Sequence, residues 1–324
     1  MTRISIQPLK RLAQALAGAA LLFGQASPAA AQAVSIGEGL GATWGQFYVA
    51  DSLKLWQKQG LEPKVVNFPS GRLVLDALVG GGVAFGTAAE TPVVFAALNG
   101  LPVRIIGTLN RHEPFDVVAT TEIKTIADLK GKKVGYAQGT NAHYYLSKAL
   151  EQAGLKFSDV TAVSLTPTDF VASLVNGALD AFVWTEPVIT KALAEGKGRF
   201  HAIKTPGLYT TFSSIITLQS TIDNNPELLT KALKALIEAD QAVKSNPDAA
   251  IAIVAEKIRL DPEITKGFWN RFNYDLGLDK PALVSALKEQ AQWAIDNKLV
   301  RPDATIPDFD KVVVGGLFDA ARAK

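Results

Sequence analysis

The sequence contains no cysteine, only three histidines and no marked excess of charge of either sign. Without cysteine there can be no disulfide scaffold, thiolate zinc site, iron–sulfur cluster, cysteine nucleophile or lipid-modified N-terminal cysteine. The 33 Lys and Arg against 31 Asp and Glu, a formal net charge of +2, do not favour nucleic-acid binding, which needs a basic face.

Long hydrophobic runs are also missing. After the N-terminal run described below, the next most apolar region is residues 73–106, which is interrupted by three consecutive glycines, two prolines and charged residues, so no uninterrupted span there reaches the roughly 20 residues that cross a bilayer. What is present is 324 residues, of which 48% are hydrophobic, with 26 Gly and 16 Pro. This composition is typical of a globular protein, and the length favours two lobes.

Catalytic motifs are missing as well. His112, His143 and His201 do not belong to a Ser/His/Asp triad or a three-histidine metal motif, and the Gly-rich stretches match neither dinucleotide nor phosphate-loop spacings. We therefore predict a binding protein rather than an enzyme, with no metal and no cofactor.

Residues 1–33 are predicted to be a secretory signal peptide. Arg3, Lys10 and Arg11 precede an apolar run of about 13 residues, Leu12 to Gly24, and an A-x-A cleavage site ends at Ala33. An anchoring or amphipathic first helix is the alternative, but the stretch lacks a polar face. We expect a soluble monomer that begins at residue 34, located in the periplasm of a diderm bacterium; secretion into the medium is a second possibility.

An internal repeat of about 95 residues relates residues 34–100 to residues 132–196. Each copy reads as strand, Gly-rich turn, helix, strand, helix, strand and helix. Three pairs of landmark residues are offset by 94, 95 and 96 positions: Gly60 and Gly154, Pro92 and Pro187, Gly100 and Gly196. Such alternation predicts an α/β fold with parallel sheets covered by helices on both faces.

The rest of the chain is expected to complete the first copy. A strand over 212–218 precedes helices that begin near the prolines at 226, 247, 262, 281 and 307. We assign residues 34–117 and 213–324 to lobe 1 and residues 118–212 to lobe 2, with hinges near 116–119 and 211–214. Because ligands of such sheets bind beyond the carboxyl ends of the strands, the turns of both copies should line one cleft.

Three strings resemble those of a known family: FYVADSLKLWQKQGLEPKVVNFPSG, IADLKGKKVGYAQGTNAHYYLSKALEQAGL and VNGALDAFVWTEP. They are similar to the nitrate-, sulfonate- and taurine-binding proteins of ABC importers, a group with a branch resembling binders of thiamine-pyrimidine precursors. The resemblance covers roughly residues 34–220. It implies a two-lobed periplasmic binding protein fold of type II-like topology, a small-molecule ligand and an inner-membrane ABC permease as partner.

The strand-to-helix turns are the candidate oxyanion sites. Free N–H groups and the positive end of a helix dipole meet at residues 139–141, and residues 70–71 form the equivalent turn of the first copy. Thr140 or Asn141 could instead only cap the helix. Arg72 could clamp an oxyanion or lie solvated on its helix, and His143 could hydrogen-bond a ligand.

Aromatic and acidic residues complete the candidate site. Two tryptophans at strand ends suggest walls around an apolar ligand body. Glu90 and Glu186 precede matching prolines and either complement helix N-termini or face the ligand, in which case an amine-bearing or heterocyclic ligand is favoured. The predicted ligand-binding residues are Trp44, Gln46, Ser70, Gly71, Arg72, Glu90, Gly139, Thr140, Asn141, His143, Trp184, Glu186 and Tyr209.

Three functions are consistent with such a cleft. The first is an importer component that closes its lobes around a sulfonate-, taurine- or nitrate-like solute and delivers it to a permease. The second is an enzyme that uses the same cleft, and the third is a ligand-sensing module. A binder of a thiamine-pyrimidine-like heterocycle is a variant of the first, because the fold alone does not name the ligand.

Overall fold

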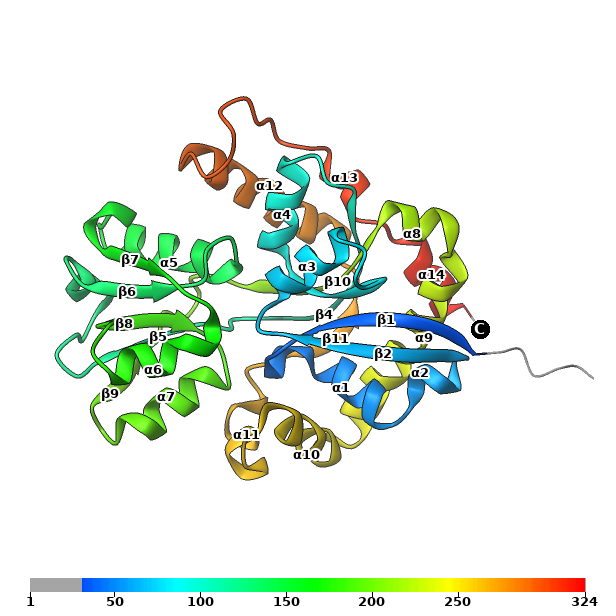
Figure 1. Ribbon diagram of the computed structural model, residues 1–324, viewed down its shortest axis with the longest axis horizontal. Coiled ribbons are helices and arrows are strands. Elements are labelled where there is room, and N and C mark those ends of the chain that lie inside the picture. Colours follow the sequence, from blue (N-terminus) through cyan, green and yellow to red (C-terminus); the bar gives the residue numbers. More distant parts are fainter. Residues whose placement is uncertain (1–30, 324) are drawn as a thin grey trace, which may run out of the picture. The chain divides into compact units, whose positions relative to one another are not determined.

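The structure is a computed structural model that describes residues 31–323. Two β-sheets organise this part of the chain (Figure 1). The first sheet has the strand order β11-β4-β10-β3-β1-β2, and the second has the order β7-β6-β8-β5-β9. Most of the predicted signal peptide, residues 1–30, lies outside the described residues. The predicted cleavage after Ala33 falls inside β1, where Gln32 and Ala33 pair with Leu61 and Glu62.

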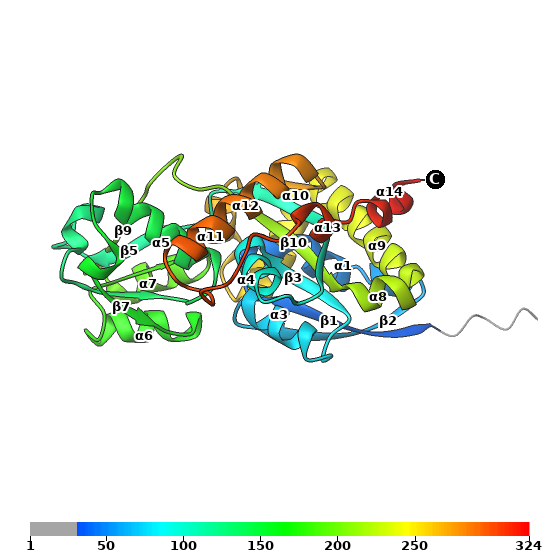
Figure 2. The ribbon, with the colours of Figure 1, turned by 90° about the horizontal axis from the view of Figure 1, so that it is seen from above.

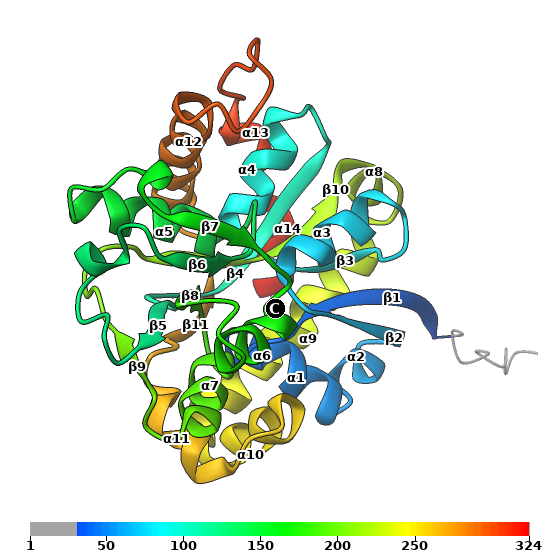
Figure 3. The same cartoon turned by 60° about the vertical axis from the view of Figure 1, so that its left-hand side comes forward.

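The first sheet is assembled from both ends of the chain. Its strands are β1 (Gln32–Gly39), β2 (Leu61–Phe68), β3 (Phe85–Ala89), β4 (Val103–His112), β10 (Thr211–Leu218) and β11 (Tyr274–Gly277). One face packs against α1 (Gly45–Ser52), α2 (Leu55–Lys58), α9 (Pro226–Ser245), α10 (Pro247–Ile258), α11 (Pro262–Trp269) and α14 (Gly316–Arg322). The other packs against α3 (Gly71–Val79), α4 (Glu90–Leu98), α12 (Lys280–Asp296) and α13 (Phe309–Val312); α3 and α4 lie next to β3 (Figures 2 and 3).

The second sheet comes from one continuous stretch. Its strands are β5 (Asp116–Thr120), β6 (Lys133–Tyr136), β7 (Thr161–Ser164), β8 (Ala181–Trp184) and β9 (Phe200–Ile203). Helix α5 (Asn141–Gln152) covers one face, and α6 (Phe170–Val175) and α7 (Val188–Gly196) cover the other (Figure 1). The core between them is rich in aromatic side chains, with Phe170 and Phe182 stacked at 5.2 Å.

The sheet topology confirms the internal repeat. Strand β1 pairs in parallel with β2 and β3, and β6 pairs in parallel with β7 and β8. Beside these expected parallel pairs, each sheet also contains a strand that has just crossed from the other. Strand β10 lies antiparallel between β3 and β4, and β5 lies antiparallel between β8 and β9.

The crossings between the sheets differ from the predicted hinges. Residues 116–119 are part of β5, where Val117 and Val118 are fully buried, and residues 211–214 are part of β10. The connecting segments are residues 113–115 and 204–210. Residues 116 and 117, predicted for lobe 1, therefore belong to the second sheet, and residues 211 and 212, predicted for lobe 2, belong to the first. Burial of the apolar side chains at these positions in the sheets stabilises the fold, and an exposed hinge would lose this stabilisation.

Turn and cap residues set the ends of the main elements. Ser70 caps α3 and Thr140 caps α5 through their side-chain oxygens. Three C-terminal helices begin at a proline, as predicted: Pro226 in α9, Pro247 in α10 and Pro262 in α11. The first helix of the first copy, expected as one element, is instead two, α1 and α2, because Lys54 takes a left-handed conformation with φ of 53°.

The C-terminal segment packs on the first sheet, as predicted, and also contacts the second. The Tyr144 hydroxyl donates to Glu289 at 2.6 Å, and the Trp293 indole donates to Ser147 at 2.9 Å, which join α5 to α12. A further bidentate ion pair joins Arg271, after α11, to the buried Asp116 at the start of β5, at 2.9 and 3.0 Å. The C-terminal segment therefore bridges both sheets.

Candidate functional site

A narrow cavity of about 40 Å³ lies where the carboxyl ends of β1 and β3 meet those of β8 and the N-terminus of α5. A space of this size holds about three water molecules, which is comparable to one small oxyanion group. Its lining residues are Leu40, Thr43, Trp44, Ser70, Gly71, Arg72, Ala89, Pro92, His112, Pro114, Phe115, Thr140, Asn141, Trp184, Thr185, Thr211 and Ser213. We call this space the cleft cavity.

The structure brings seven of the predicted ligand-binding residues together in the cleft cavity. These are Trp44, Ser70, Gly71, Arg72, Thr140, Asn141 and Trp184. They come from both copies of the repeat, and they meet because both copies place their strand-to-helix turns at the same ends of their strands.

Two helices, α3 and α5, begin at the cavity. The Ser70 hydroxyl accepts from the N–H of Leu73 at 3.4 Å, and the Thr140 hydroxyl accepts from the N–H of Ala142 at 3.2 Å. Capping satisfies one N–H group of each helix, and the first turn of a helix has others without intrahelical partners. Thr140 therefore caps its helix, and other N–H groups of the first turn and the helix dipole stay available to an anion.

Arg72 is the one charged residue that lines the cleft cavity. Its Nε lies 3.3 Å from both carboxylate oxygens of Asp76 on the same helix, and its side chain is 40% exposed. Its guanidinium also lies against Gly139, where an added Cβ would be 2.2 Å from Nη1. Gly139 has φ of 73°, so both its backbone conformation and the arginine require glycine. Arg72 is therefore partly solvated and also lies against the turn of the second copy at Gly139.

Two buried polar side chains at the cavity have no hydrogen-bond partner among residues 31–323. They are His112, through both ring nitrogens, and Thr185, through its hydroxyl. Burial, followed by the charge of Arg271, lowers the pKa of His112 to about 3, so its ring is neutral at physiological pH. A neutral imidazole offers one donor and one acceptor. Unpaired buried polar groups are costly, which indicates that a ligand or water satisfies them.

Sequence reasoning missed several lining residues that no motif marks. His112 is the last residue of β4, and Thr211 and Ser213 lie on the return strand β10. The Thr43 hydroxyl lies 2.7 Å from that of Ser213, which joins the 3-10 turn 42–44 to this strand. Their common signal is a polar side chain near a strand end on the cavity side of the sheet.

Apolar residues form the walls, as the tryptophans suggested. Trp44 and Trp184 are each 6% exposed. Phe115 lies 6.2 Å from Trp184, ring centroid to centroid, and adds a wall that the sequence analysis did not identify. The cavity can therefore take the apolar body of a ligand beside its polar head.

Glu90 lies outside the cleft cavity. Its carboxylate is fully buried and accepts hydrogen bonds from the hydroxyls of Tyr209 and Thr211, from the N–H of Phe212 at 3.0 Å and from Nε2 of Gln290 at 2.9 Å. Burial raises its pKa despite these bonds. Glu90 lies in the first turn of α4, which is the helix-end alternative, and its carboxylate also joins this turn to the second crossing and to α12.

Glu186 and Gln46 also lie away from the cavity. The Glu186 carboxylate accepts from the N–H of Thr190 at 3.0 Å, which is the helix-end alternative, and burial raises its pKa. The Gln46 amide donates to the carbonyl of Leu109 at 2.7 Å and to Asp240 at 3.2 Å, inside the first lobe. Gln46 lies on the first turn of α1 and Glu186 just before α7, and both side chains bond to groups away from the cavity.

Tyr209 and His143 do not line the cleft cavity. The Tyr209 hydroxyl is used by Glu90, and its ring lines a separate surface pocket. The His143 ring packs 4.9 Å from Tyr136 and 5.1 Å from Trp293, and burial lowers its pKa to about 4. His143 and Gly139 line a wider groove of about 640 Å³ next to the cleft cavity, which shares Arg72 with it.

Within residues 31–323, no group of three or more His, Asp and Glu side chains could hold a metal ion. No helix in this range combines the length and the hydropathy needed to cross a membrane.

Two α/β sheets joined by two crossings, with a cavity at the ends of their strands, define the periplasmic binding protein fold. The chain belongs to the NMT1/THI5-like family, whose model matches residues 43–250. It is 31% identical to a putative aliphatic sulfonates-binding protein of Escherichia coli over 284 residues, 86% of this chain and 88% of that protein.

Solved structures agree with this assignment. The periplasmic aliphatic sulphonate binding protein SsuA of Escherichia coli superposes with a TM-score of 0.73 at 26% identity, covering 87% of this chain and 92% of that one. The alkanesulfonate-binding protein SsuA of Xanthomonas axonopodis pv. citri bound to MOPS has a TM-score of 0.79 at 20% identity, over 88% and 98% of the two chains, and supports the fold alone.

Proposed function

We propose that this protein is the solute-binding component of an ABC importer and that it captures a small alkanesulfonate in the periplasm. The observation that carries the proposal is the charge of the cleft cavity. Two helix N-termini and Arg72 face it, and none of its lining residues is acidic. Such a site stabilises a monoanion through N–H groups, the helix dipoles and one guanidinium.

The positions of the two glutamates change the preferred ligand. With Glu90 and Glu186 turned away, the cavity offers no carboxylate to an ammonium group. An amine-bearing ligand such as taurine would lose the hydration of its ammonium without gaining a partner. We therefore favour a sulfonate without an amine over the zwitterion, and the apolar walls favour it over nitrate, which has no apolar body.

The family and fold support the remaining parts of the proposal. The segments 113–115 and 204–210 serve as hinges, the lobes close over the solute, and the closed form is presented to a permease. Closure removes water from the ligand and so strengthens each polar contact.

Calorimetry with the purified protein tests this function. Ethanesulfonate should bind, taurine should bind more weakly, and nitrate and 4-amino-5-hydroxymethyl-2-methylpyrimidine should bind least. The variant Arg72→Gln removes one charge-assisted contact, worth roughly 1.5 to 3 kcal/mol, and should weaken ethanesulfonate binding about tenfold or more. The matched control Arg301→Gln changes an exposed arginine that lines none of the cavities described above. Tight pyrimidine binding without sulfonate binding would overturn the proposal.

A further inference from the structure

A second groove, of about 600 Å³, adjoins the cleft cavity. It lies between α7 and the preceding β8 end on one side and the C-terminal end of α10 on the other, and we call it the α7–α10 groove. Leu40 and Trp184 line both spaces, so the groove is continuous with the cavity. A ligand whose head group fills the small cavity must extend the rest of its body into a neighbouring space.

The walls of the α7–α10 groove are mostly apolar. Beside Leu40 and Trp184 they include Val171, Val188 and Ile258, together with three prolines. The other exit from the cavity passes Arg72 into the wider groove, whose lining includes the polar side chains of Asp76, Asn99 and Gln138. A hydrocarbon chain or ring is therefore better accommodated in the α7–α10 groove.

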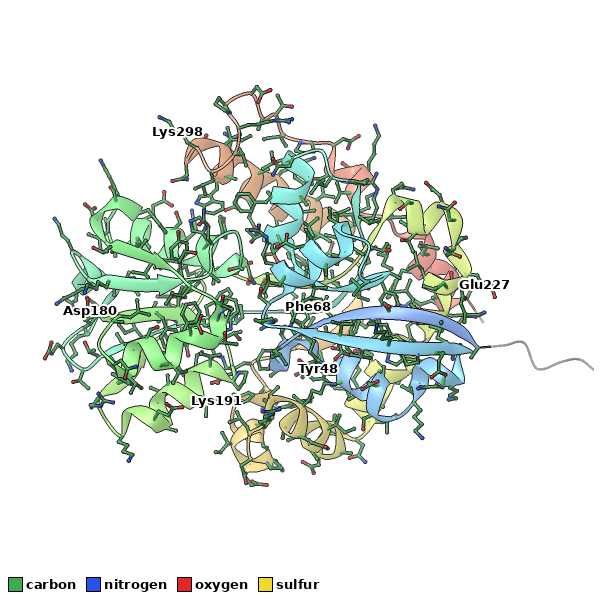
Figure 4. All side chains as sticks on the ribbon, in the orientation of Figure 1. Tyr48, Phe68, Asp180, Lys191, Glu227 and Lys298 are labelled. Carbon is green, nitrogen blue, oxygen red and sulfur yellow. The ribbon has the colours of Figure 1, made fainter. Side chains whose placement is uncertain are left out.

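Three cationic side chains also line this groove, with no carboxylate among the lining residues: Lys191, Lys257 and Arg259. The Lys191 ammonium donates to the carbonyl of Ile258 at 3.0 Å, which links α7 to the end of α10; Figure 4 labels Lys191 on α7. Its pKa is lowered by burial and by the charge of Arg259. These two cations are therefore close enough to repel each other.

The three cations differ in whether a carboxylate lies close enough to pair with them. Lys257 lies 3.5 Å from the buried Glu38 and 3.6 Å from Asp51. Glu38 is fully buried, and burial raises its pKa to about 7. The guanidinium of Arg259 has no hydrogen-bond or ion-pair partner among residues 31–323. The groove thus holds more positive charge than its carboxylate neighbours neutralise.

We propose that the α7–α10 groove is the subsite for the ligand tail and that it selects sulfonates whose hydrocarbon body ends in a second anion, a carboxylate. This proposal rests on the proposed function, because the sulfonate head in the cleft cavity directs the tail past Trp184. The apolar walls take the hydrocarbon, and Arg259 and Lys191 pair with the distal carboxylate. A guanidinium is well suited to a planar carboxylate, which it can bind through two parallel hydrogen bonds.

Two matched ligands test the proposal by calorimetry. 4-Sulfobenzoate and toluene-4-sulfonate share the ring and the sulfonate and differ only in a carboxylate in place of a methyl group. The wild-type protein should bind 4-sulfobenzoate about tenfold tighter or more, and this preference should decrease with added salt because it depends on partly exposed charges. Equal affinities, or tighter binding of toluene-4-sulfonate, would overturn the proposal.

Variants separate the tail subsite from the head-group site. Arg259 has φ of 57°, so Arg259→Asn removes the charge with a residue that tolerates this left-handed conformation. It should reduce the preference for 4-sulfobenzoate several-fold while leaving the affinities for toluene-4-sulfonate and ethanesulfonate unchanged. The control Lys124→Asn removes an exposed charge outside the groove and should not change the affinity for either ligand.

The outcomes distinguish the two proposals. If ethanesulfonate binds but the preference is absent, or if Arg259→Asn leaves the preference unchanged, the tail subsite is wrong and the proposed function stands. If no sulfonate binds at all, the proposed function is wrong, and the tail subsite fails with it. A second variant, Val188→Asp, places a carboxylate in the groove and should also remove the preference.

Discussion

Replacing Glu90 with glutamine should change how the stability of the protein depends on pH. The carboxylate is fully buried and accepts four hydrogen bonds, from Tyr209, Thr211, Phe212 and Gln290. Burial nevertheless raises its pKa above the ordinary value of 4.5. The folded state therefore holds a proton on Glu90 more tightly than the unfolded state does.

The direction of the effect follows from this difference. A group whose pKa is raised by folding contributes stability that is fully present below its unfolded pKa and is lost as the pH rises through its folded pKa. Glutamine does not titrate in this range. The stability of Glu90→Gln relative to the wild type should therefore improve as the pH rises from about 4.5 to 8.

The magnitude combines two contributions. The amide keeps one acceptor oxygen where the carboxylate had two, so one or two of the four hydrogen bonds are weakened, at about 1 kcal/mol each. At pH 5 the melting temperature of Glu90→Gln should be roughly 2 to 4 °C below that of the wild type. Each unit of pKa elevation returns about 1.4 kcal/mol at high pH, so the gap should narrow as the pH rises toward 8.

Thermal unfolding followed by circular dichroism at several pH values measures this gap. Glu122→Gln, which changes an exposed glutamate, is the matched control and should show little pH-dependent difference from the wild type. A gap that widens as the pH rises from 5 to 8 would refute the reasoning, because it would mean that folding favours the ionised carboxylate. Ethanesulfonate should bind Glu90→Gln and the wild type with similar affinity, since Glu90 does not line the cleft cavity.

Three further predictions concern the sheet crossings and the cavity. Arg271→Met leaves the buried Asp116 carboxylate without its partner and should lower stability by roughly 2 to 4 kcal/mol in thermal unfolding. Gly139→Ala should weaken ethanesulfonate binding in calorimetry, because the new Cβ displaces the neighbouring guanidinium. His112→Gln should reduce the loss of stability between pH 6.5 and 4.5, since a histidine whose pKa is lowered to about 3 destabilises the fold as the unfolded chain becomes protonated.

Each of these predictions has its own control. Adding Asp116→Asn to Arg271→Met should recover part of the lost stability, and no recovery would contradict the ion-pair argument. Gly207→Ala introduces the same left-handed strain, with φ of 76° but nothing within 4 Å, so it should cost stability without affecting affinity. Equal affinity losses in the two glycine variants would argue against a specific role of Gly139. Melting curves of His112→Gln with an unchanged pH slope would show that His112 is not the group that titrates.

The sequence supported the fold more fully than the site. Gly60 and Gly154 mark equivalent positions of the repeat because a left-handed turn after a helix demands glycine, and both have positive φ. Ser70 and Thr140 could also be identified from the sequence, since helix caps depend on local spacing. Local rules thus located the turns that reach the cavity.

The errors come from residues whose surroundings are distant in sequence. Glu90 and Glu186 stand at matching positions of the repeat. Glu90 nevertheless accepts hydrogen bonds from groups about 120 and 200 positions away in the sequence, whereas Glu186 accepts one from a residue four positions away. The β5 segment appeared to be a hinge because its pairing partners, β8 and β9, follow it by more than 60 residues. No local pattern carries such information.

The sequence by itself determined the alternation of strands and helices, the repeat and the turns at the strand ends, because these depend on periodicity and on the backbone preferences of glycine, proline and capping residues. Only the tertiary structure decided which side chains face the cleft cavity. A side chain on the first turn of a helix points into the cleft or into the core according to which elements pack beside it, as Arg72 and Gln46 show. The unpaired ring nitrogens of His112 and the grouping of cations in the α7–α10 groove follow only from the packing of segments that are far apart in the chain.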